Sequence, residues 1–442
     1  MDEALQLDKI EDAEIVTLLQ SSDAESSSDD ELNPTTNKSA SNDSSPGDSS
    51  VWKTAANLVN YIEGIGFLTV PYALKEGGIV ALLAFIIIPI ILWYVGKILT
   101  ECLYDEDEKG KKRRVRSDFK DLGDALLPKY GGYVVSCVIQ IQVFLLSVSY
   151  LVLCGSVMRK TLPSVPITEV SWIAITGVLV LPTAFLKSLS QIAWLSVFSV
   201  LALVVVVVSV VWYAAEHTYE WDLGTILFWD NEGVVASLSI ILFSYGIYIV
   251  VPSVEKSMVE KAKFGKALAL AYVVSVLMKL SFSMCAFLSF GTNTDQVVLN
   301  NLPPGPVHIT VGCFFAVNCV LTYALAIYPL VQVMDNSFTT RIHCDQLPTF
   351  LRSAVVRVII VFLTVVVAIL VPDFAIIVTF MGCTVESLTG YIFPFALHLK
   401  LKYKQLKIYQ VFLESVLLVF GVLITIFGIT VVIRALIKFY EQ

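Results

Sequence analysis

One interrupted stretch near the start of the apolar sequence decides the fold of this chain, Asn60-Tyr61-Ile62-Glu63-Gly64-Ile65-Gly66. It puts a carboxylate and two glycines where a membrane-spanning helix is normally most uniform. Backbone polar groups in hydrocarbon must be hydrogen-bonded within the protein, so helix-weakening residues are tolerated there mainly when they line an enclosed cavity. An ionisable side chain at that depth indicates a functional site. The stretch therefore predicts the substrate site of a transporter.

The composition identifies a polytopic membrane protein. Of 442 residues, 56% are hydrophobic and only 15% are charged, against roughly 25% charged in soluble domains. The eight cysteines are scattered, without CxxC or Cys/His pairing. We therefore expect no bound metal, no disulfide framework and no cofactor. No nucleophile and base are spaced as in an enzyme, and no nucleic-acid partner is expected.

The acidity of the chain belongs to its N-terminal tail. Residues 1–50 hold 13 acidic and 2 basic side chains, and residues 21–50 hold 11 serines with almost no large apolar side chain. Such a segment cannot bury enough surface to offset the entropy of ordering. We expect residues 1–50 to be a disordered tail and residues 51–442 to form the transmembrane domain.

A short pattern in the tail, Glu14 followed by Leu18 and Leu19, fits the acidic dileucine signal for endolysosomal sorting. It would bind a clathrin adaptor. The alternative is a chance amphipathic turn.

Apolar stretches of about 20 residues predict eleven crossings of a lipid bilayer. They lie near 54–74, 77–103, 133–158, 170–187, 191–214, 234–254, 265–290, 307–331, 353–371, 374–398 and 409–437. With a cytosolic tail, the cytosolic connections carry 19 basic residues and the opposite connections carry 3. By the positive-inside rule the N-terminus is cytosolic. An odd number of crossings then places Gln442 in the lumen or outside.

Two of the crossings carry matching interruptions. The first has Gly64 and Gly66 before Pro71, and the sixth has Gly246 before Pro252. Paired interruptions at corresponding positions of two five-helix halves indicate an inverted-repeat transporter with its site at the bilayer midplane. We therefore predict an all-α fold with a five-plus-five inverted repeat and broken first and sixth helices.

The predicted breaks suit a zwitterion. The half-helix that begins near Gly66 presents backbone N–H groups and a positive dipole end to a substrate carboxylate. Unwound carbonyls near Ile62 and Ser244 suit an ammonium group. This arrangement favours amino acids.

Several stretches carry a resemblance to a known family. They are Val70-Pro71-Tyr72-Ala73, Gly78, Gly96 to Tyr104, Arg114-Val115-Arg116, Ala184-Phe185-Leu186-Lys187, Phe243-Ser244-Tyr245, Pro252-Ser253, Asn301-Leu302-Pro303 and Leu397-His398-Leu399. With them, the chain from about Trp52 to the last crossing resembles the amino acid/auxin permease family of the amino acid-polyamine-organocation fold. Within that family it looks most like the vesicular inhibitory amino acid (GABA/glycine) transporter group.

The resemblance implies a proton-coupled carrier of vesicular, lysosomal or vacuolar membranes that loads GABA, glycine or a related small neutral amino acid. Chloride involvement and the direction of flux stay open. The alternatives are a lysosomal or vacuolar amino acid-proton exporter and a transceptor that signals luminal amino acids.

Three ionisable residues inside the crossings are candidates for proton coupling. Glu63 and Glu386 stand where relatives carry uncharged residues, so the substrate cannot simply be inherited from the resemblance. Burial raises the proton affinity of a carboxylate, so either residue suits a proton carrier. Lys279 lies mid-span, where it must pair, for example with Glu386, or snorkel to the interface.

Other polar side chains are candidates to orient a small ligand in an apolar pocket. Tyr150 matches a tyrosine of the resembled family and is a candidate to close over the substrate carboxylate. The candidate substrate-binding residues are Asn60, Glu63, Gly64, Gly66, Tyr150, Ser244, Tyr245, Tyr248, Asn318, Thr322 and Tyr323. For each polar side chain the alternative is a packing role. The four histidines, His217, His308, His343 and His398, lie near predicted span ends and are expected at the surface.

Overall fold

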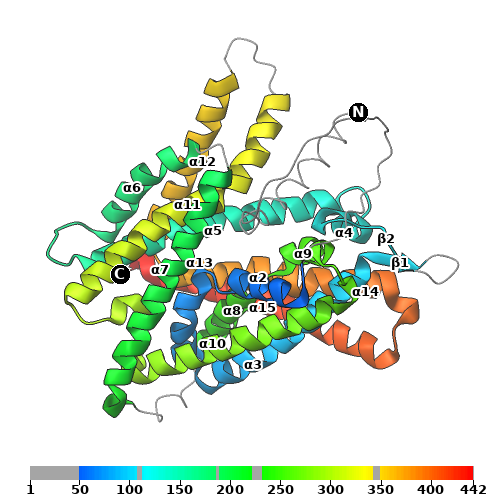
Figure 1. The fold of residues 1–442 in the computed structure, drawn as a ribbon, viewed down its shortest axis with the longest axis horizontal. Coiled ribbons are helices and arrows are strands. Elements are labelled where there is room, and N and C mark those ends of the chain that lie inside the picture. Colours follow the sequence, from blue (N-terminus) through cyan, green and yellow to red (C-terminus); the bar gives the residue numbers. More distant parts are fainter. Residues whose placement is uncertain (1–48, 107–111, 186–188, 222–230, 342–348, 442) are drawn as a thin grey trace, which may run out of the picture.

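The computed structural model describes residues 49–106, 112–185, 189–221, 231–341 and 349–441. The tail with Glu14, Leu18 and Leu19 lies outside the described residues, as does His343. Helices dominate the part that is described (Figure 1). They are α2 (Val51–Ile62), α3 (Val70–Cys102), α4 (Phe119–Leu126), α5 (Gly131–Thr161), α6 (Glu169–Val180), α7 (Leu189–Glu216), α8 (Asn231–Tyr245), α9 (Val251–Ser257), α10 (Phe264–Phe290), α11 (Pro306–Arg341), α12 (Thr349–Leu370), α13 (Phe374–Met381), α14 (Phe393–Lys402) and α15 (Ile408–Glu441).

Short elements connect the helices. The 3₁₀ turns are η2 (Ile65–Thr69), η3 (Pro182–Phe185), η4 (Thr218–Glu220), η6 (Tyr248–Val250), η7 (Lys261–Lys263), η8 (Gly291–Asn293), η9 (Val298–Asn301) and η12 (Tyr403–Gln405). Two π-helical turns, η10 (Gly382–Glu386) and η11 (Leu388–Ile392), join α13 to α14. Strands β1 (Tyr104–Glu106) and β2 (Lys112–Arg114) pair antiparallel, with Tyr104 opposite Arg114.

Within the described residues, eight helical segments are long and apolar enough to cross a membrane. They are Ile65–Cys102, Gly131–Thr161, Asn231–Ser257, Lys261–Asn293, Pro306–Asp335, Ser353–Leu370, Phe374–Gln405 and Ile408–Glu441. Two shorter apolar helices cover Glu169–Val180 and Val200–Glu216. The all-α polytopic class is confirmed, and the count of eleven crossings stays a prediction.

Both predicted helix breaks are present. The first crossing runs from α2 through Glu63 and Gly64 into η2 and then α3, and the sixth runs from α8 through Gly246 into η6 and then α9. In each case a proline, Pro71 or Pro252, occupies the first turn of the second half-helix. Proline suits that position because its missing N–H would have no partner in the helix there.

The long α3 contains a further break at Gly78, whose φ of 52° and ψ of −132° are not helical. Positive φ is easy only for glycine, which lacks a Cβ. The break lies next to the predicted boundary between the first and second crossings.

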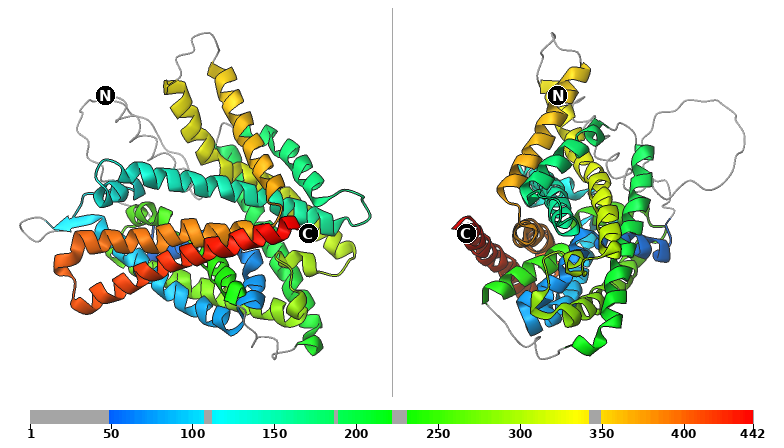
Figure 2. Two further views of the ribbon diagram at one scale, coloured as in Figure 1. Left: turned by 180° about the vertical axis from the view of Figure 1, so that it is seen from behind. Right: turned by 90° about the vertical axis from the view of Figure 1, so that its left-hand side faces the viewer.

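The helices pack in two groups that contact one another. One contains α2, α3, α8 and α10, and the other contains α5, α6, α7, α11 and α12. Figure 1 shows α6, α11 and α12 gathered on one side and α3, α8 and α10 on the other. Helix α15, in red, runs along the outside beside α14 (Figure 2).

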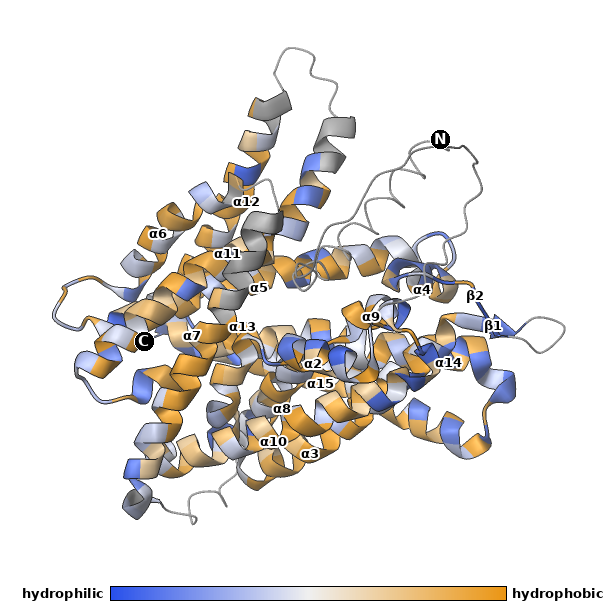
Figure 3. Cartoon of the chain, in the orientation of Figure 1, coloured by the Kyte–Doolittle hydropathy of each residue, from blue (hydrophilic) through white to orange (hydrophobic). Residues whose placement is uncertain are grey.

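The outer faces of the helices are apolar (Figure 3). On α3 they expose Ile86, Ile87 and Ile90, and on α15 they expose Phe412 and Phe427. Exposed apolar side chains on hydrogen-bonded helices are what a lipid environment requires. Hydrophilic residues collect around β1 and β2 (Figure 3).

Candidate functional site

The two broken helices touch at their interruptions. A methyl group at Gly66 would lie 3.0 Å from the Cα of Ser244 and 3.1 Å from the Phe243 ring. Gly66 is therefore needed for the close approach of η2 to the end of α8. By contrast, the nearest atom to a methyl group at Gly64 would be 3.9 Å away.

Lys279 on α10 bridges the two breaks. Its side chain is fully buried, and its Nζ donates to the carbonyl oxygen of Ile62 at 3.1 Å and to that of Ser244. The ammonium also lies 4.7 Å from the centre of the Tyr245 ring, in cation–π range. The carbonyls expected to receive a substrate ammonium thus receive the ammonium of Lys279.

Glu63 completes this cluster. Its carboxylate lies 3.7 Å from Lys279 Nζ and is 9% exposed. Ser275, one turn before Lys279 on α10, also faces the carboxylate. Without Lys279 the buried Glu63 carboxylate would be left uncompensated in a low-dielectric interior, which is costly.

The pairing differs from the sequence expectation. Lys279 pairs with Glu63 rather than with Glu386, and it does not snorkel, because its side chain has no exposure. The helix break at Glu63 brings its carboxylate next to α10. The sequence around Lys279 does not indicate this contact.

Glu386 lies at the other break. It ends the π-helical turn η10, is 3% exposed and accepts a hydrogen bond from Gln142 Nε2 on α5 at 2.7 Å. A methyl group at Gly246 would come within 2.1 Å of Glu386 Oε2, so the carboxylate rests against the unwound part of the sixth crossing. π-helical turns occur frequently at functional sites.

Aromatic side chains surround this second carboxylate. Tyr61, Tyr248 and Tyr272 lie within electrostatic range of Glu386. Tyr248 is 2% exposed and packs against Gly390 on η11. The Tyr272 hydroxyl lies 3.4 Å from the carbonyl oxygen of Tyr245.

The remaining predicted site residues lie at different places. Tyr150 on α5 is 8% exposed and neighbours Cys319 on α11. Asn318 accepts a hydrogen bond from Thr322 at 3.1 Å one turn away. The Tyr323 hydroxyl bonds Thr364 at 2.7 Å and therefore serves the α11–α12 contact.

Asn60 is exposed near the end of α2, next to the break. Sequence reasoning missed Gln142, Tyr272 and Ser275. An amide in the apolar stretch 133–158 was the available signal for Gln142.

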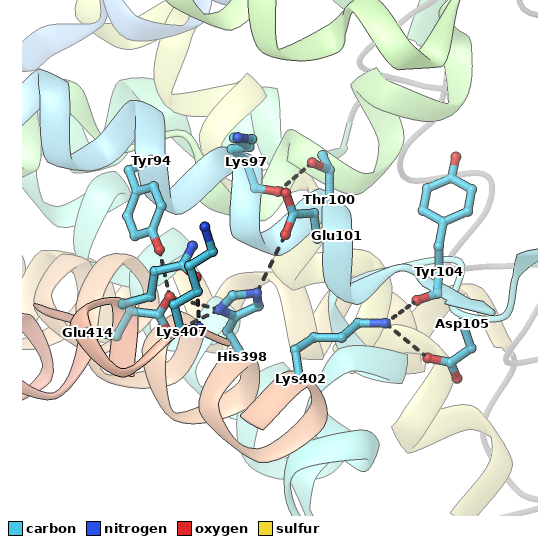
Figure 4. A network of polar contacts seen from close by, with 11 residues as sticks. Tyr94, Lys97, Thr100, Glu101, Tyr104, Asp105, His398, Lys402, Lys407 and Glu414 are labelled. Atoms are coloured by element: carbon cyan, nitrogen blue, oxygen red, sulfur yellow. Dashed lines mark hydrogen bonds and ion pairs between the residues drawn. The ribbon is translucent and has the colours of Figure 1, made fainter. Parts of the chain in front are cut away.

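A third polar network joins α3, α14 and α15 (Figure 4). His398 Nδ1 lies 2.9 Å from both oxygens of Glu414, and its Nε2 lies 3.6 Å from Glu101. Tyr94 donates to Glu414 at 2.6 Å. Glu414 has no exposure and His398 is 2% exposed. The expectation that His398 lies at the surface is wrong, because α14 packs between α3 and α15. His308, 5% exposed, is buried as well.

The β-hairpin holds the end of the sixth crossing. Arg114 forms an ion pair with Glu255 on α9 and donates to the carbonyl oxygen of Pro252 at 2.9 Å. Tyr104 donates to the same carboxylate. Burial and this hydrogen bond raise the pKa of the Tyr104 phenol.

Within the described part of the chain, no three His, Cys, Asp or Glu side chains converge as metal ligands.

Comparisons with known proteins agree with this architecture. A model of the "Transmembrane amino acid transporter protein" family matches residues 47–434. The vesicular inhibitory amino acid transporter of Xenopus tropicalis is 30% identical over 88% of this chain and 78% of its own length. The vesicular GABA transporter of Caenorhabditis elegans is 26% identical over 86% and 78% of the two chains.

More distant proteins share the fold. The amino acid transporter AVT1I of Arabidopsis thaliana is 24% identical over 88% of this chain and 96% of its own length. A solved structure titled as the inward-facing conformation of Mhp1 aligns with a TM-score of 0.54 at 11% identity, covering 88% of this chain and 89% of that chain. The broken first and sixth helices, the close approach of Gly66 to Ser244 and a match over residues 47–434 lead to one conclusion: the chain belongs to the transmembrane amino acid transporter family.

Proposed function

We propose that the protein is a secondary active, proton-coupled transporter that loads GABA, glycine or a related small neutral amino acid into vesicles or endolysosomes. The observation that carries the proposal is the pair of helix breaks that face one another at Gly66 and Ser244. The unwound backbone of two broken helices offers its polar groups to a small zwitterion at membrane depth. The named relatives support the substrate class.

The substrate carboxylate is assigned to the start of η2. The first N–H groups of a helix have no partner within the helix and carry its positive dipole end. A methyl group on Gly64, immediately before η2, would meet its nearest neighbour only at 3.9 Å. All five residues of η2 are buried, and a charged contact is stronger in a low-dielectric interior than in water.

The buried carboxylates support proton coupling. A carboxyl group in a low-dielectric interior takes up a proton more readily than in water. Glu63 forms an ion pair with Lys279, whereas Glu386 accepts a hydrogen bond from the neutral amide of Gln142. An acidic lumen then supplies the proton that drives exchange.

Uptake into proteoliposomes with an acidic interior tests this proposal. We expect radiolabelled GABA or glycine to accumulate, and accumulation to stop when an ionophore dissipates the pH gradient. If the amino acid only equilibrated across the membrane, with or without the pH gradient, the proposed proton coupling would be refuted. Accumulation of none of the common amino acids would favour a sensing role instead.

The proposed membrane topology places the tail in the cytosol, where the signal Glu14, Leu18 and Leu19 would bind a clathrin adaptor. Replacing both Leu18 and Leu19 by Ala should move the protein to the plasma membrane. An unchanged vesicular distribution would argue against the signal.

A further inference from the structure

Three buried ionisable side chains lie at the two breaks, and their charges do not balance. Glu63 and Lys279 form an ion pair at 3.7 Å. Glu386 has a hydrogen bond from Gln142 at 2.7 Å, and no Lys, Arg or His of the described residues forms an ion pair with it. These side chains therefore include one more carboxylate than ammonium group. In a low-dielectric interior an isolated carboxylate is neutralised, either by a proton or by a cation.

Three backbone carbonyls at the breaks are already occupied. The carbonyls of Ile62 and Ser244 bond Lys279, and the carbonyl of Tyr245 lies 3.4 Å from the Tyr272 hydroxyl. An arriving ammonium group would have to displace one of these donors. The Glu386 carboxylate lies against the unwound segment, because its Oε2 rests on Gly246. It differs from the Glu63 carboxylate in that none of the described cationic side chains forms an ion pair with it.

The groups that face Glu386 suit a cation. Gln142 on α5 donates a hydrogen bond to Glu386, and Tyr61 on α2, Tyr248 on η6 and Tyr272 on α10 lie within electrostatic range of it, with Tyr391 on η11 within the same range of Tyr248 and Tyr272. Aromatic rings attract an ammonium through their negative faces. On the α15 side, Gly428 packs against Cys383 of η10. All of these neighbours are neutral near pH 7 by their ordinary acidities.

We propose that Glu386 holds a proton when the site is empty and the ammonium group of the amino acid when it is loaded. The substrate ammonium, arriving from the cytosol, displaces the carboxyl proton, which leaves to the cytosol, and Glu386 becomes a carboxylate paired with the ammonium. On release into an acidic lumen the carboxylate takes up a proton again. Each turnover then moves one proton from the lumen to the cytosol for each ammonium group moved from the cytosol to the lumen. This assignment rests on the proposed amino acid substrate and specifies its coupling residue.

The binding test uses the full-length protein in nanodiscs, with GABA and glycine as probes. For the wild type, the apparent Kd should weaken by up to about tenfold for each pH unit below the transition, because one proton is displaced per ligand. Glu386→Gln should bind weakly and without pH dependence, whereas Glu386→Asp should keep the slope. The matched control Glu414→Gln should also keep it, because Glu414 is equally buried but belongs to the network with Tyr94 and His398. An unchanged slope in Glu386→Gln refutes the proposal.

A second measurement needs no substrate. Difference infrared spectroscopy between pH 5 and pH 8 should show the carbonyl band of a protonated carboxylic acid, and Glu386→Gln should remove it. If the wild type and Glu386→Gln do not differ in this band, the proposal is overturned, whichever amino acid is carried. If the band is present but neither GABA nor glycine binds, the proposed substrate is wrong and the proton site stands. Gel filtration and circular dichroism establish that each variant is folded.

Discussion

Lys279→Met should destabilise the protein far more than an ordinary lysine substitution. The change removes the ion pair with Glu63 and the hydrogen bonds to the carbonyls of Ile62 and Ser244. Removing one partner of a buried ion pair costs about 3–5 kcal/mol, because the other charge is left uncompensated. We expect a loss of about 3–5 kcal/mol in the free energy of unfolding.

The partner substitution has a smaller expected effect. In Glu63→Gln, Lys279 keeps both carbonyl bonds, so the cost is about 1–2 kcal/mol, in the range of one hydrogen bond to a charged group. In the double variant, Glu63→Gln with Lys279→Met, no buried charge remains. Its cost should fall below the sum of the single costs by at least about 1 kcal/mol, as expected for residues in direct contact.

Equilibrium unfolding in mixed micelles, followed by tryptophan fluorescence, measures these free energies. Lys266→Met is the matched control, because Lys266 lies on the same helix and is exposed. It should change stability by no more than about 0.5 kcal/mol. If Lys279→Met behaved like Lys266→Met, or if the two single effects simply added, the bridging role of Lys279 would be refuted.

Two further predictions concern packing and the third network. Gly66→Ala should lower stability by about 1–3 kcal/mol through overpacking against Ser244 and reduce uptake, whereas Gly64→Ala, with 3.9 Å of clearance, should fold normally; equal stabilities would contradict the close approach. His398→Leu should cost about 1–3 kcal/mol because buried Glu414 loses its imidazole partner, and adding Glu414→Leu should recover part of the loss. The same unfolding assay measures both, and a silent His398→Leu would show that the network contributes little.

The breaks were predictable because their causes are local. Gly64, Gly66 and Gly246 weaken a helix wherever they occur in it, and Pro71 and Pro252 restart it from the first turn. The apolar stretches likewise indicate, by their own composition, that they are buried or contact lipid. The polytopic all-α class therefore followed from the composition and length of these stretches.

The pairing of the charges was not predictable in the same way. Lys279 and Ile62 are 217 positions apart, and Gln142 and Glu386 are 244 positions apart. A local pattern does not report which distant helix will face a side chain. The surface expectation for His398 failed for the same reason, since its position near a predicted span end does not tell that α3 and α15 cover it.

By itself, the sequence determined that the chain crosses a membrane repeatedly and interrupts two helices at matching places, because glycine, proline and apolar runs act through the local backbone. Only the tertiary structure decided that Lys279 occupies the carbonyls of both breaks and that no cationic side chain in the described part of the chain pairs with Glu386. The reason is physical: the energy of a buried charge depends on what surrounds it in space, and helix packing brings those neighbours from elements far apart in the chain.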